Sequence, residues 1–399
     1  MQDVGTTESF EDVDWSSISR SRRLISWELG TLIIGYVTLS CLYATDQLSV
    51  APSLLSTWRP EFVEWVLLYG VVFLVAYGVV PVARNRHAVW RLLTRLQNRP
   101  ITIFAGLYLL VFFVVGLFGP IVYEDPGLNF GYAFQPPIGF SGELTAPQCA
   151  GDVTGGAFDR RCHGSWSYPL GTNHRGYPLG YLLIEGARIA VYVTVFTAAF
   201  VVPIATGLGI VTGLHGGIVD DILMSIIDVQ MSIPAILLYF VGYAIFNPSL
   251  LLLLVSFGLL SWGGITRLVR SETLRRRERG HVLVARSLGA PNSYLARRHI
   301  LPNVTNTVVP AMFQLLALLV LIEAGIAFLG FHELELYSWG STISESINAQ
   351  IAGQHQIRAD RPASDIWWVS AFPALILTVT ISALKVVGDG LRDALDPRL

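Results

Sequence analysis

The stretch RSETLRRRERGHVLVARSLGAPNSYLARRHILPN, residues 270–303, decides how the rest of the chain is interpreted, because long apolar segments flank it on both sides. Nine of the 27 basic residues of the chain lie between positions 267 and 298. Charged side chains are costly inside a bilayer. A basic segment of this length therefore predicts a region in water between two membrane-spanning segments.

Helix signals occur inside this stretch. Helix-favouring residues run from about position 278 to 288 and stop at Gly289, where a residue without Cβ can adopt the left-handed conformation of a helix end. Pro291 is typical of the opening of a second helix, which Pro302 is predicted to end. Two short helices joined at Gly289 are therefore expected.

The first of these helices carries an apolar stripe that predicts a contact with another protein. The stripe consists of Val282, Ala285 and Leu288, with Arg286 beside it. Arg286 is interpreted either as a partner contact or as a solvated charge or membrane anchor. The three arginines at positions 275–277 are interpreted as determinants of membrane topology, that is, of the side of the bilayer on which this segment lies.

Composition defines the class of protein. The 399 residues are 52% hydrophobic and 14% charged, and the mean hydropathy is +0.53. These values are too apolar for an ordinary soluble domain and indicate a multi-span membrane protein. A net charge of −2 gives no overall bias towards nucleic acid.

Eight apolar segments are long enough, or nearly so, to cross a bilayer. They are residues 29–45, 65–83, 101–123, 189–214, 222–246, 250–265, 307–331 and 367–384. The predicted fold is an all-α polytopic membrane protein with about eight transmembrane helices. If both termini are cytosolic, 20 of the 27 basic residues face the cytosol, which agrees with the positive-inside rule.

The polar stretch 124–186 is too long for a tight connection and predicts a small folded element outside the cell. It contains Cys149 and Cys162, whereas Cys41 lies in an apolar span. Either Cys149 and Cys162 are free thiols or they form a disulfide. We favour the disulfide, because the loop lacks an obvious core.

Some chemistries are excluded. Lys385, the only lysine, follows Leu384, so a Gly-Lys-Ser/Thr phosphate loop cannot exist here. The histidines and cysteines lack metal-site spacing. Asp228 and Glu323 lie in predicted spans and are interpreted as structural or pairing residues, with an ion path as the alternative. Lys385 is interpreted as a residue that reaches the membrane interface.

From position 168 to the end, the chain resembles the permease subunits of ATP-binding cassette importers of the dipeptide, oligopeptide and nickel class, specifically the second, C-type permease of the pair. The matching segments are PLGT (169–172) with Gly176, GARI (186–189), Asp228 with Pro234, ARSLGA (285–290), RHILPN (298–303), FLGF (328–331), SWG (338–340) and GDGLRDALDPR (388–398). The resemblance implies the transmembrane domain of a type I importer.

The resemblance implies that residues 270–303 are the loop that couples the permease to an ATPase. The implied coupling residues are Val282, Ala285, Arg286, Leu288, Gly289, Ala290, Leu301 and Pro302. The chain departs from the family at Leu283-Val284-Ala285, where the family has Glu-Ala-Ala, and near Asn173, where the family has Gly-Thr-Asp.

The implied organisation has five parts. These are a cytosolic tail (1–28), an extension with two extra transmembrane helices and a basic cytosolic loop (29–100), the first family-type helix with the extracytoplasmic loop (101–186), the permease core (187–390) and a cytosolic tail (391–399). A prokaryotic plasma membrane is the implied location.

The function implied by the resemblance is that of a non-catalytic permease subunit in an ATP-driven importer of peptides or related small solutes. The implied partners are a second homologous permease, two ATPase subunits that bind ATP and Mg²⁺, an extracytoplasmic substrate-binding protein and membrane lipid. The alternative is an ion-coupled secondary carrier or a membrane scaffold. Nickel and sugars remain alternative substrates.

Overall fold

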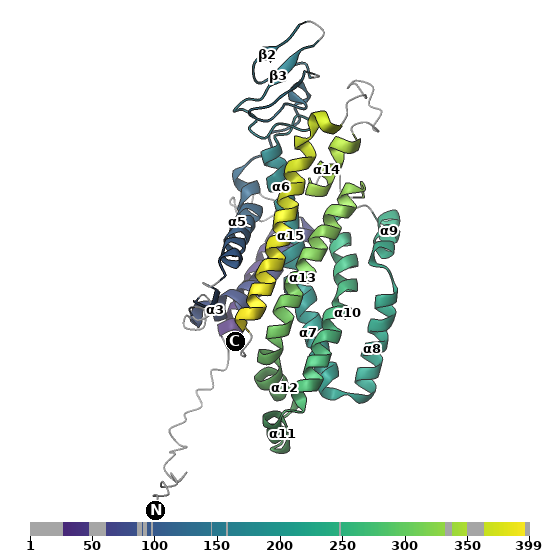
Figure 1. The fold of residues 1–399 in the computed structure, drawn as a ribbon. Helices are drawn as coiled ribbons and strands as arrows, with labels where there is room; N and C mark the ends of the chain where they lie inside the picture. Colours follow the sequence, from purple (N-terminus) through teal and green to yellow (C-terminus); the bar gives the residue numbers. More distant parts are fainter. Residues whose placement is uncertain are drawn as a thin grey trace, which may run out of the picture.

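The computed structural model describes residues 27–47, 61–85, 90, 94–96, 99–144, 146–156, 159–246, 249–331, 337–348 and 363–395. The described chain is a bundle of long helices with a small sheet at one end (Figure 1). Most of the predicted tail 1–28, the Asn247-Pro248 break and most of the polar segment 332–366 lie outside the described residues.

The first helices form a hairpin at the side of the bundle. They are α1 (Trp27–Gln47), α2 (Phe62–Leu74), the π-helical turn η2 (Val75–Val79) and α3 (Val80–Arg84). Edge-to-face ring contacts join α1 to α2, with Tyr36 and Tyr69 centroids 5.2 Å apart and Tyr43 and Trp65 centroids 5.4 Å apart. No residue in the most apolar 18-residue segment of α1 is buried, so this helix forms the outermost layer.

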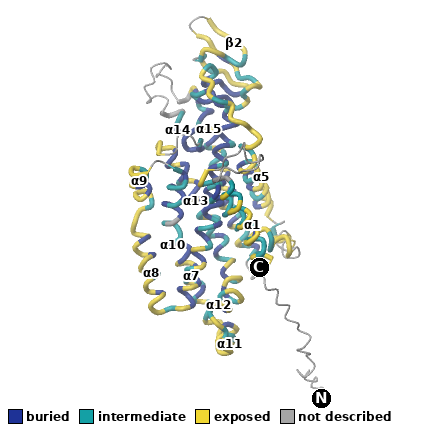
Figure 2. Tube along the Cα trace, turned by 180° about the vertical axis from the view of Figure 1, so that it is seen from behind, coloured by how far each residue is buried: buried dark blue, intermediate teal, exposed yellow. Residues whose placement is uncertain are grey.

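The centre of the bundle is built from α6 (Leu179–Phe196), η4 (Thr197–Val201), α7 (Val202–His215), α10 (Leu250–Arg277) and α13 (Leu301–Phe328). Helices α5 (Pro100–Val122) and α15 (Trp368–Leu395) pack against this centre with one face and are mostly exposed on the other. In the span from α6 to α7, 72% of the most apolar 18-residue segment is buried inside the protein. Figure 2 shows the contrast with the exposed α8 and α9.

Helices α8 (Gly217–Ser232) and α9 (Ala235–Ile245) take the place of the straight span predicted for residues 222–246. The two are bent by 71° relative to each other, at Ile233 and Pro234. Proline restricts the residue before it to extended conformations, and Ile233 is extended. Within the described residues, seven helices are long and apolar enough to cross a membrane, or eight if this bent pair is one span, in agreement with the expected number.

Several spans extend further than predicted. Helix α6 begins at Leu179, α10 continues to Arg277 and α15 continues to Leu395. The sequence prediction stopped at charged residues, but many of these charges are paired. Arg188, for example, forms ion pairs with Glu185 and Glu64.

The helix predicted to end at Pro302 continues through it. Helix α12 (Asn292–Leu295) passes through the π-helical turn η5 (Ala296–Ile300) into α13, and residues 292–328 form one span. The same arrangement precedes Pro81, after η2, and Pro203, after η4. In each case the residue before the proline donates its N–H to the carbonyl five residues earlier. A proline ring clashes with the carbonyl four residues back, and the wider turn relieves that clash.

The cap, which we define as the described residues between 124 and 178, lies at one end of the bundle (Figure 1). It contains η3 (Phe130–Tyr132), β1 (Ser141–Glu143), β2 (Val153–Thr154) and β3 (Arg161–His163). The strands form an antiparallel sheet in the order β1-β3-β2, with Cys162 opposite both Gly142 and Val153. The sheet gives the predicted small folded element a definite structure.

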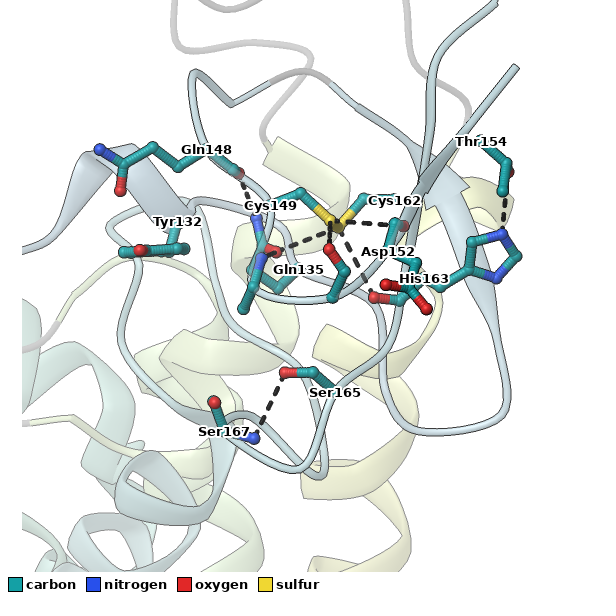
Figure 3. Close-up of a disulfide and its surroundings, with 12 residues drawn as sticks. Tyr132, Gln135, Gln148, Cys149, Asp152, Thr154, Cys162, His163, Ser165 and Ser167 are labelled. Atoms are coloured by element: carbon teal, nitrogen blue, oxygen red, sulfur yellow. Dashed lines mark hydrogen bonds between the residues drawn. A yellow bond between two sulfur atoms is a disulfide. The ribbon is translucent and has the colours of Figure 1, made fainter.

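A disulfide joins Cys149 to Cys162 in the structure, with Cα atoms 5.7 Å apart (Figure 3). The buried side chain of Gln135 lies beside it, donating to the carbonyl of Gln148 at 3.0 Å and accepting from the N–H of Ala150 at 3.0 Å. The disulfide and this amide together hold the segment 148–150 against the sheet.

Helix α14 (Trp339–Asn348) and the 3₁₀ turn η6 (Ala363–Ile366) complete this end. Trp339 is buried and donates its indole N–H to the carbonyl of Leu183 in α6 at 3.0 Å. Gly340 lies so close to the carbonyl of Ala324 in α13 that a Cβ would be 1.8 Å from it. The Ser-Trp-Gly sequence therefore packs α14 tightly between α6 and α13.

Candidate coupling site

The end of α10 is tied firmly to its neighbours at the end of the bundle opposite the cap. Arg270 forms a two-pronged ion pair with Asp220 of α8, with Nε to Oδ1 at 2.6 Å and Nη2 to Oδ2 at 2.5 Å. Arg277 donates to the carbonyl of Gly213 in α7 at 3.0 Å. A displacement at this end of α10 would therefore be carried into α7 and α8.

Helix α11 (Gly280–Ser287) follows α10 and protrudes from the bundle (Figure 1). Its end has the hydrogen bonds of a Schellman motif, since the N–H of Ala290 binds the carbonyl of Ala285 at 3.1 Å and the N–H of Gly289 binds that of Arg286 at 3.0 Å. Gly289 has a φ of +83°, as the motif requires. The predicted helix end at Gly289 is thus present in the structure.

The predicted apolar stripe is divided between two environments. Val282 is 1% exposed and points into the protein, whereas Leu288 is 83% exposed. The apolar surface that α11 offers to a partner consists instead of Leu288 with Leu283 and Val284, which are 47% and 60% exposed. The sequence prediction used only helical spacing and did not identify Leu283 and Val284, which stand where the family has Glu-Ala.

The base of α11 is held by aromatic and apolar contacts. The rings of His281 and His299 lie 5.7 Å apart, and Tyr294 lies 5.8 Å from His299. Leu295 and Ile300 are buried close by in α12 and η5. These contacts fix α11 to the start of the α13 span, so that α11 is connected to both α10 and α13.

The remaining predicted coupling residues lie around this protrusion. Arg286 is exposed on α11, and Ala290 is half-buried at the turn that follows. Leu301 and Pro302 are exposed, but on the α13 span and beyond α12 rather than on α11. The structure thus groups Arg286 with the exposed apolar residues of α11 and separates Leu301 and Pro302 from them.

The charged residues inside the predicted spans have partners. Asp228 of α8 forms an ion pair with Arg267 of α10. Glu323 of α13 is buried and hydrogen-bonded to Ser338, just before α14. Both contacts support the structural interpretation of these carboxylates.

A second site, at the cap end, was not identified from the sequence. Thr172 and Asn173 are fully buried. The Asn173 side chain accepts from the N–H groups of Arg175 at 3.0 Å and Tyr177 at 2.9 Å, and it donates to Glu345 of α14 at 2.9 Å. The segment that departs from the family pattern is therefore the point where the cap is attached to the bundle.

Tyr177, in the same segment, is also enclosed. Its ring stacks on Tyr181 and lies 5.1 Å from the ring of Tyr337. Burial, together with the Tyr337 hydroxyl, raises the pKa of Tyr177. The residue is therefore neutral at physiological pH and acts in packing.

A multi-span helical bundle with a protruding, partly apolar helix between two of its spans is the architecture expected of a membrane protein that contacts a partner through that helix. A family model described as a binding-protein-dependent transport system inner membrane component matches residues 205–399. Its match includes the whole of the candidate coupling site.

Three relatives illustrate the similarity. The chain is 32% identical over 230 residues to the oligopeptide transport system permease protein OppC of Escherichia coli K12, covering 57% of this chain and 72% of that protein. It is 30% identical over 244 residues to the glutathione transport system permease protein GsiD of Pectobacterium atrosepticum, covering 61% and 77%. It is 29% identical over 231 residues to the dipeptide transport system permease protein DppC of Bacillus subtilis, covering 58% and 68%.

The chain belongs to the family of inner membrane permease components of binding-protein-dependent transport systems. It is the non-catalytic membrane component of such a system. The family model begins at position 205, so α1, α2, α5, α6 and the cap precede the matched region.

Proposed function

We propose that this chain is the C-type permease of an ATP-driven importer for peptides or related small solutes. The proposal draws its substrate class from relatives that are named for the transport of dipeptides, oligopeptides and glutathione. The observation that carries the coupling part of the proposal is the exposed apolar surface of α11, formed by Leu283, Val284 and Leu288 on a helix fixed to both α10 and α13.

The proposed partners are a second homologous permease, two ATPase subunits and an extracytoplasmic binding protein. ATP and Mg²⁺ would be bound by the ATPase subunits. We place α11 and both termini in the cytosol, which follows from the distribution of basic residues. The cap then faces the binding protein, with its disulfide on the oxidising side of the membrane.

In the proposed mechanism α11 enters a groove on one ATPase subunit, with Arg286 beside the apolar contact. Closure of the ATPase pair displaces α11 and, through it, the ends of α10 and α13. The Arg270–Asp220 ion pair and the Arg277 hydrogen bond pass this displacement to α8 and α7. Nucleotide would thus shift the equilibrium between two arrangements of the spans, which is coupling between distant sites.

We also propose the division of the chain given by the sequence. Residues 29–100 form an extension, 101–186 carry the first family-type helix and the extracytoplasmic element, and 187–390 form the core that contains the coupling segment 270–303. The hairpin of α1 and α2 packs at the side of α6, in keeping with an added element.

The complete importer in proteoliposomes tests this proposal. Uptake of a short peptide is expected to need the binding protein, both permeases and ATP hydrolysis, and to stop when the ATPase is inactivated. A collapsed ion gradient should leave uptake unchanged. Uptake that follows an ion gradient in the absence of nucleotide would instead support the secondary carrier and contradict the importer.

A further inference from the structure

A groove with a volume of about 420 Å³ lies between α13 and α15. Three polar side chains line it, Gln314 from α13 with Lys385 and Asp389 from α15. Apolar side chains line the remainder, among them Leu318, Leu321 and Ile381. The groove thus combines apolar side chains with a few polar groups, as small-molecule sites do.

The exposed face of α15 changes in character along the helix. Its exposed residues include Ala371, Leu375, Thr378 and Val379 in the first half, which is mostly apolar, and the polar Ser382, Lys385 and Asp389 further on. The exposed large residues of α5, by contrast, are all apolar, as a helix in lipid requires, with Leu110 and Phe118 as examples. The face of α15 that borders the groove is therefore suited to water or a polar partner.

The charged groups of the groove lie well inside the bundle. Asp393 of α15 forms an ion pair with Arg99 at 2.5 Å, just before α5 begins. Lys385 precedes Asp393 by two helical turns, and a helix rises about 1.5 Å per residue, so Lys385 is about 12 Å further into the bundle. The sequence interpretation placed Lys385 at the end of a span, but α15 continues to Leu395.

Within the described part of the chain, neither Lys385 nor Asp389 is in an ion pair, and Gln314 makes no hydrogen bond through its side chain. Other charges in the spans, such as Arg188 and Asp228, are paired within the chain. Unpaired charges at this depth are costly in lipid, so they mark a water-filled path or a ligand site.

We propose that the groove between α13 and α15 is this chain's part of the solute path, and that Lys385 and Asp389 bind the carboxylate and the ammonium of a zwitterionic solute. The proposal rests on the importer function proposed above and adds a site and a solute chemistry to it.

The geometry is compatible with this chemistry. Lys385 and Asp389 are four residues apart on one helix, and side chains at that spacing start about 5–6 Å apart. An ammonium and a carboxylate at this separation can each meet the opposite charge at the two ends of a short peptide. Gln314, on the facing helix, can donate to and accept from a peptide group.

Thiol labelling of the assembled importer tests the water-filled path. In a chain with Cys41→Ser, a thiol placed by Lys385→Cys is expected to react with a membrane-impermeant methanethiosulfonate in at least one nucleotide state. The reacting thiolate forms in water and not in lipid, so labelling should be at least about tenfold faster than for Leu110→Cys on α5. Equal labelling rates for the two thiols, both with nucleotide bound and without it, would overturn the proposal.

Solute selectivity tests the two charges. Uptake of a dipeptide with free ends is compared with that of its C-terminal amide and its N-acetyl derivative, with the same binding protein throughout. Lys385→Gln is expected to reduce the preference for the free carboxylate by about tenfold, and Asp389→Asn the preference for the free ammonium by a similar factor. Lys385→Arg, which keeps the charge, should retain most of the preference.

The outcomes separate this inference from the importer proposal. Unchanged preferences in Lys385→Gln and Asp389→Asn, with ATP-driven uptake intact, would overturn the site and leave the importer standing. Loss of co-purification with the second permease in both variants would also overturn it, because the groove would then be the interface between the permeases. Uptake without nucleotide in the unmodified chain would instead contradict the importer itself.

Discussion

Arg188 of α6 forms an ion pair with Glu64 of α2, two residues separated by 124 positions in the chain. The hydroxyl of Tyr192 also donates to Glu64 at 3.0 Å, and a second carboxylate, Glu185, lies 3.4 Å from the guanidinium. Glu64 belongs to the additional hairpin, whereas Arg188 belongs to a span that passes through the centre of the bundle. The pair therefore attaches the hairpin to the permease.

Replacing Glu64 with Gln is expected to loosen this attachment. Arg188 would keep Glu185 but lose a charged hydrogen-bond partner, which costs about 1.5–3 kcal/mol. The measurement is the melting midpoint of the detergent-solubilised protein. Glu278→Gln, at an exposed carboxylate after α10, serves as the control, and a midpoint for Glu64→Gln equal to that of the control would show that the ion pair contributes little.

Replacing Asn173 with Asp, the residue that the family has here, is expected to destabilise this chain. The carboxylate could still accept from Arg175 and Tyr177, but it would face Glu345, to which the Asn173 amide now donates. The loss of a buried donor costs about 1–3 kcal/mol, and the like charges add to it. Thermal unfolding and limited proteolysis of the cap report the effect.

The matched double variant makes the same prediction sharper. Asn173→Asp combined with Glu345→Gln restores a donor opposite an acceptor, so it should recover most of the lost stability. Glu345→Gln alone should cost less than Asn173→Asp alone. If the double variant were no more stable than Asn173→Asp, the two residues would not be coupled.

The Cys149–Cys162 disulfide predicts a difference between the three thiols. Without reductant neither Cys149 nor Cys162 should react with an alkylating reagent, and all three cysteines should react after reduction and unfolding. Closing a loop of this length is worth about 3 kcal/mol. Cys149→Ser with Cys162→Ser should therefore lower the stability of the cap, whereas Cys41→Ser should not. Three reactive thiols before reduction would refute the bond.

The features that depend on neighbouring residues in the chain were predictable. Gly289 ends α11 because a left-handed residue is needed there, and that need is local. The number of spans followed from the length of the apolar segments. The ends of the spans could not be predicted in this way. The ion pair of Arg188 with Glu64 joins distant positions in the chain, and it allows a charged residue to lie within a membrane-spanning helix.

Two errors have the same physical origin. Pro302 was expected to end a helix, but the π-helical turn η5 accommodates the ring, and whether such a turn forms depends on the packing of the span. Helical spacing placed Val282 on one stripe with Leu288, but it cannot tell which side of α11 faces the bundle. Tertiary contacts, such as that of His281 with His299, decide this orientation.

Replacing Gly289 with Val is expected to weaken ATPase association while membrane insertion remains intact. A left-handed conformation costs a residue with Cβ about 1–2 kcal/mol, and a β-branched residue more, so the turn after α11 would change. Pull-down of the ATPase measures the effect. Gly280→Val, at the start of α11, and Gly330→Val, which has a φ of +85° at the far end of α13, are the controls, and equal association in all three variants would contradict the coupling role.

Replacing Leu288 with Glu should weaken ATPase association without altering the fold. Leu288 is 83% exposed, so the change leaves no cavity, but it places a charge in the centre of the apolar surface of α11. Residues at the centre of an interface commonly contribute more than 1.4 kcal/mol, which corresponds to a loss of at least about tenfold in affinity. Val153→Glu, an equivalent change on β2 of the cap, should leave the affinity unchanged.

A comparison with Leu301 locates the contact. Since Leu301 lies apart from the apolar surface of α11, Leu301→Glu should reduce the affinity for the ATPase less than Leu288→Glu does. The reverse order would place the ATPase contact on the α13 span.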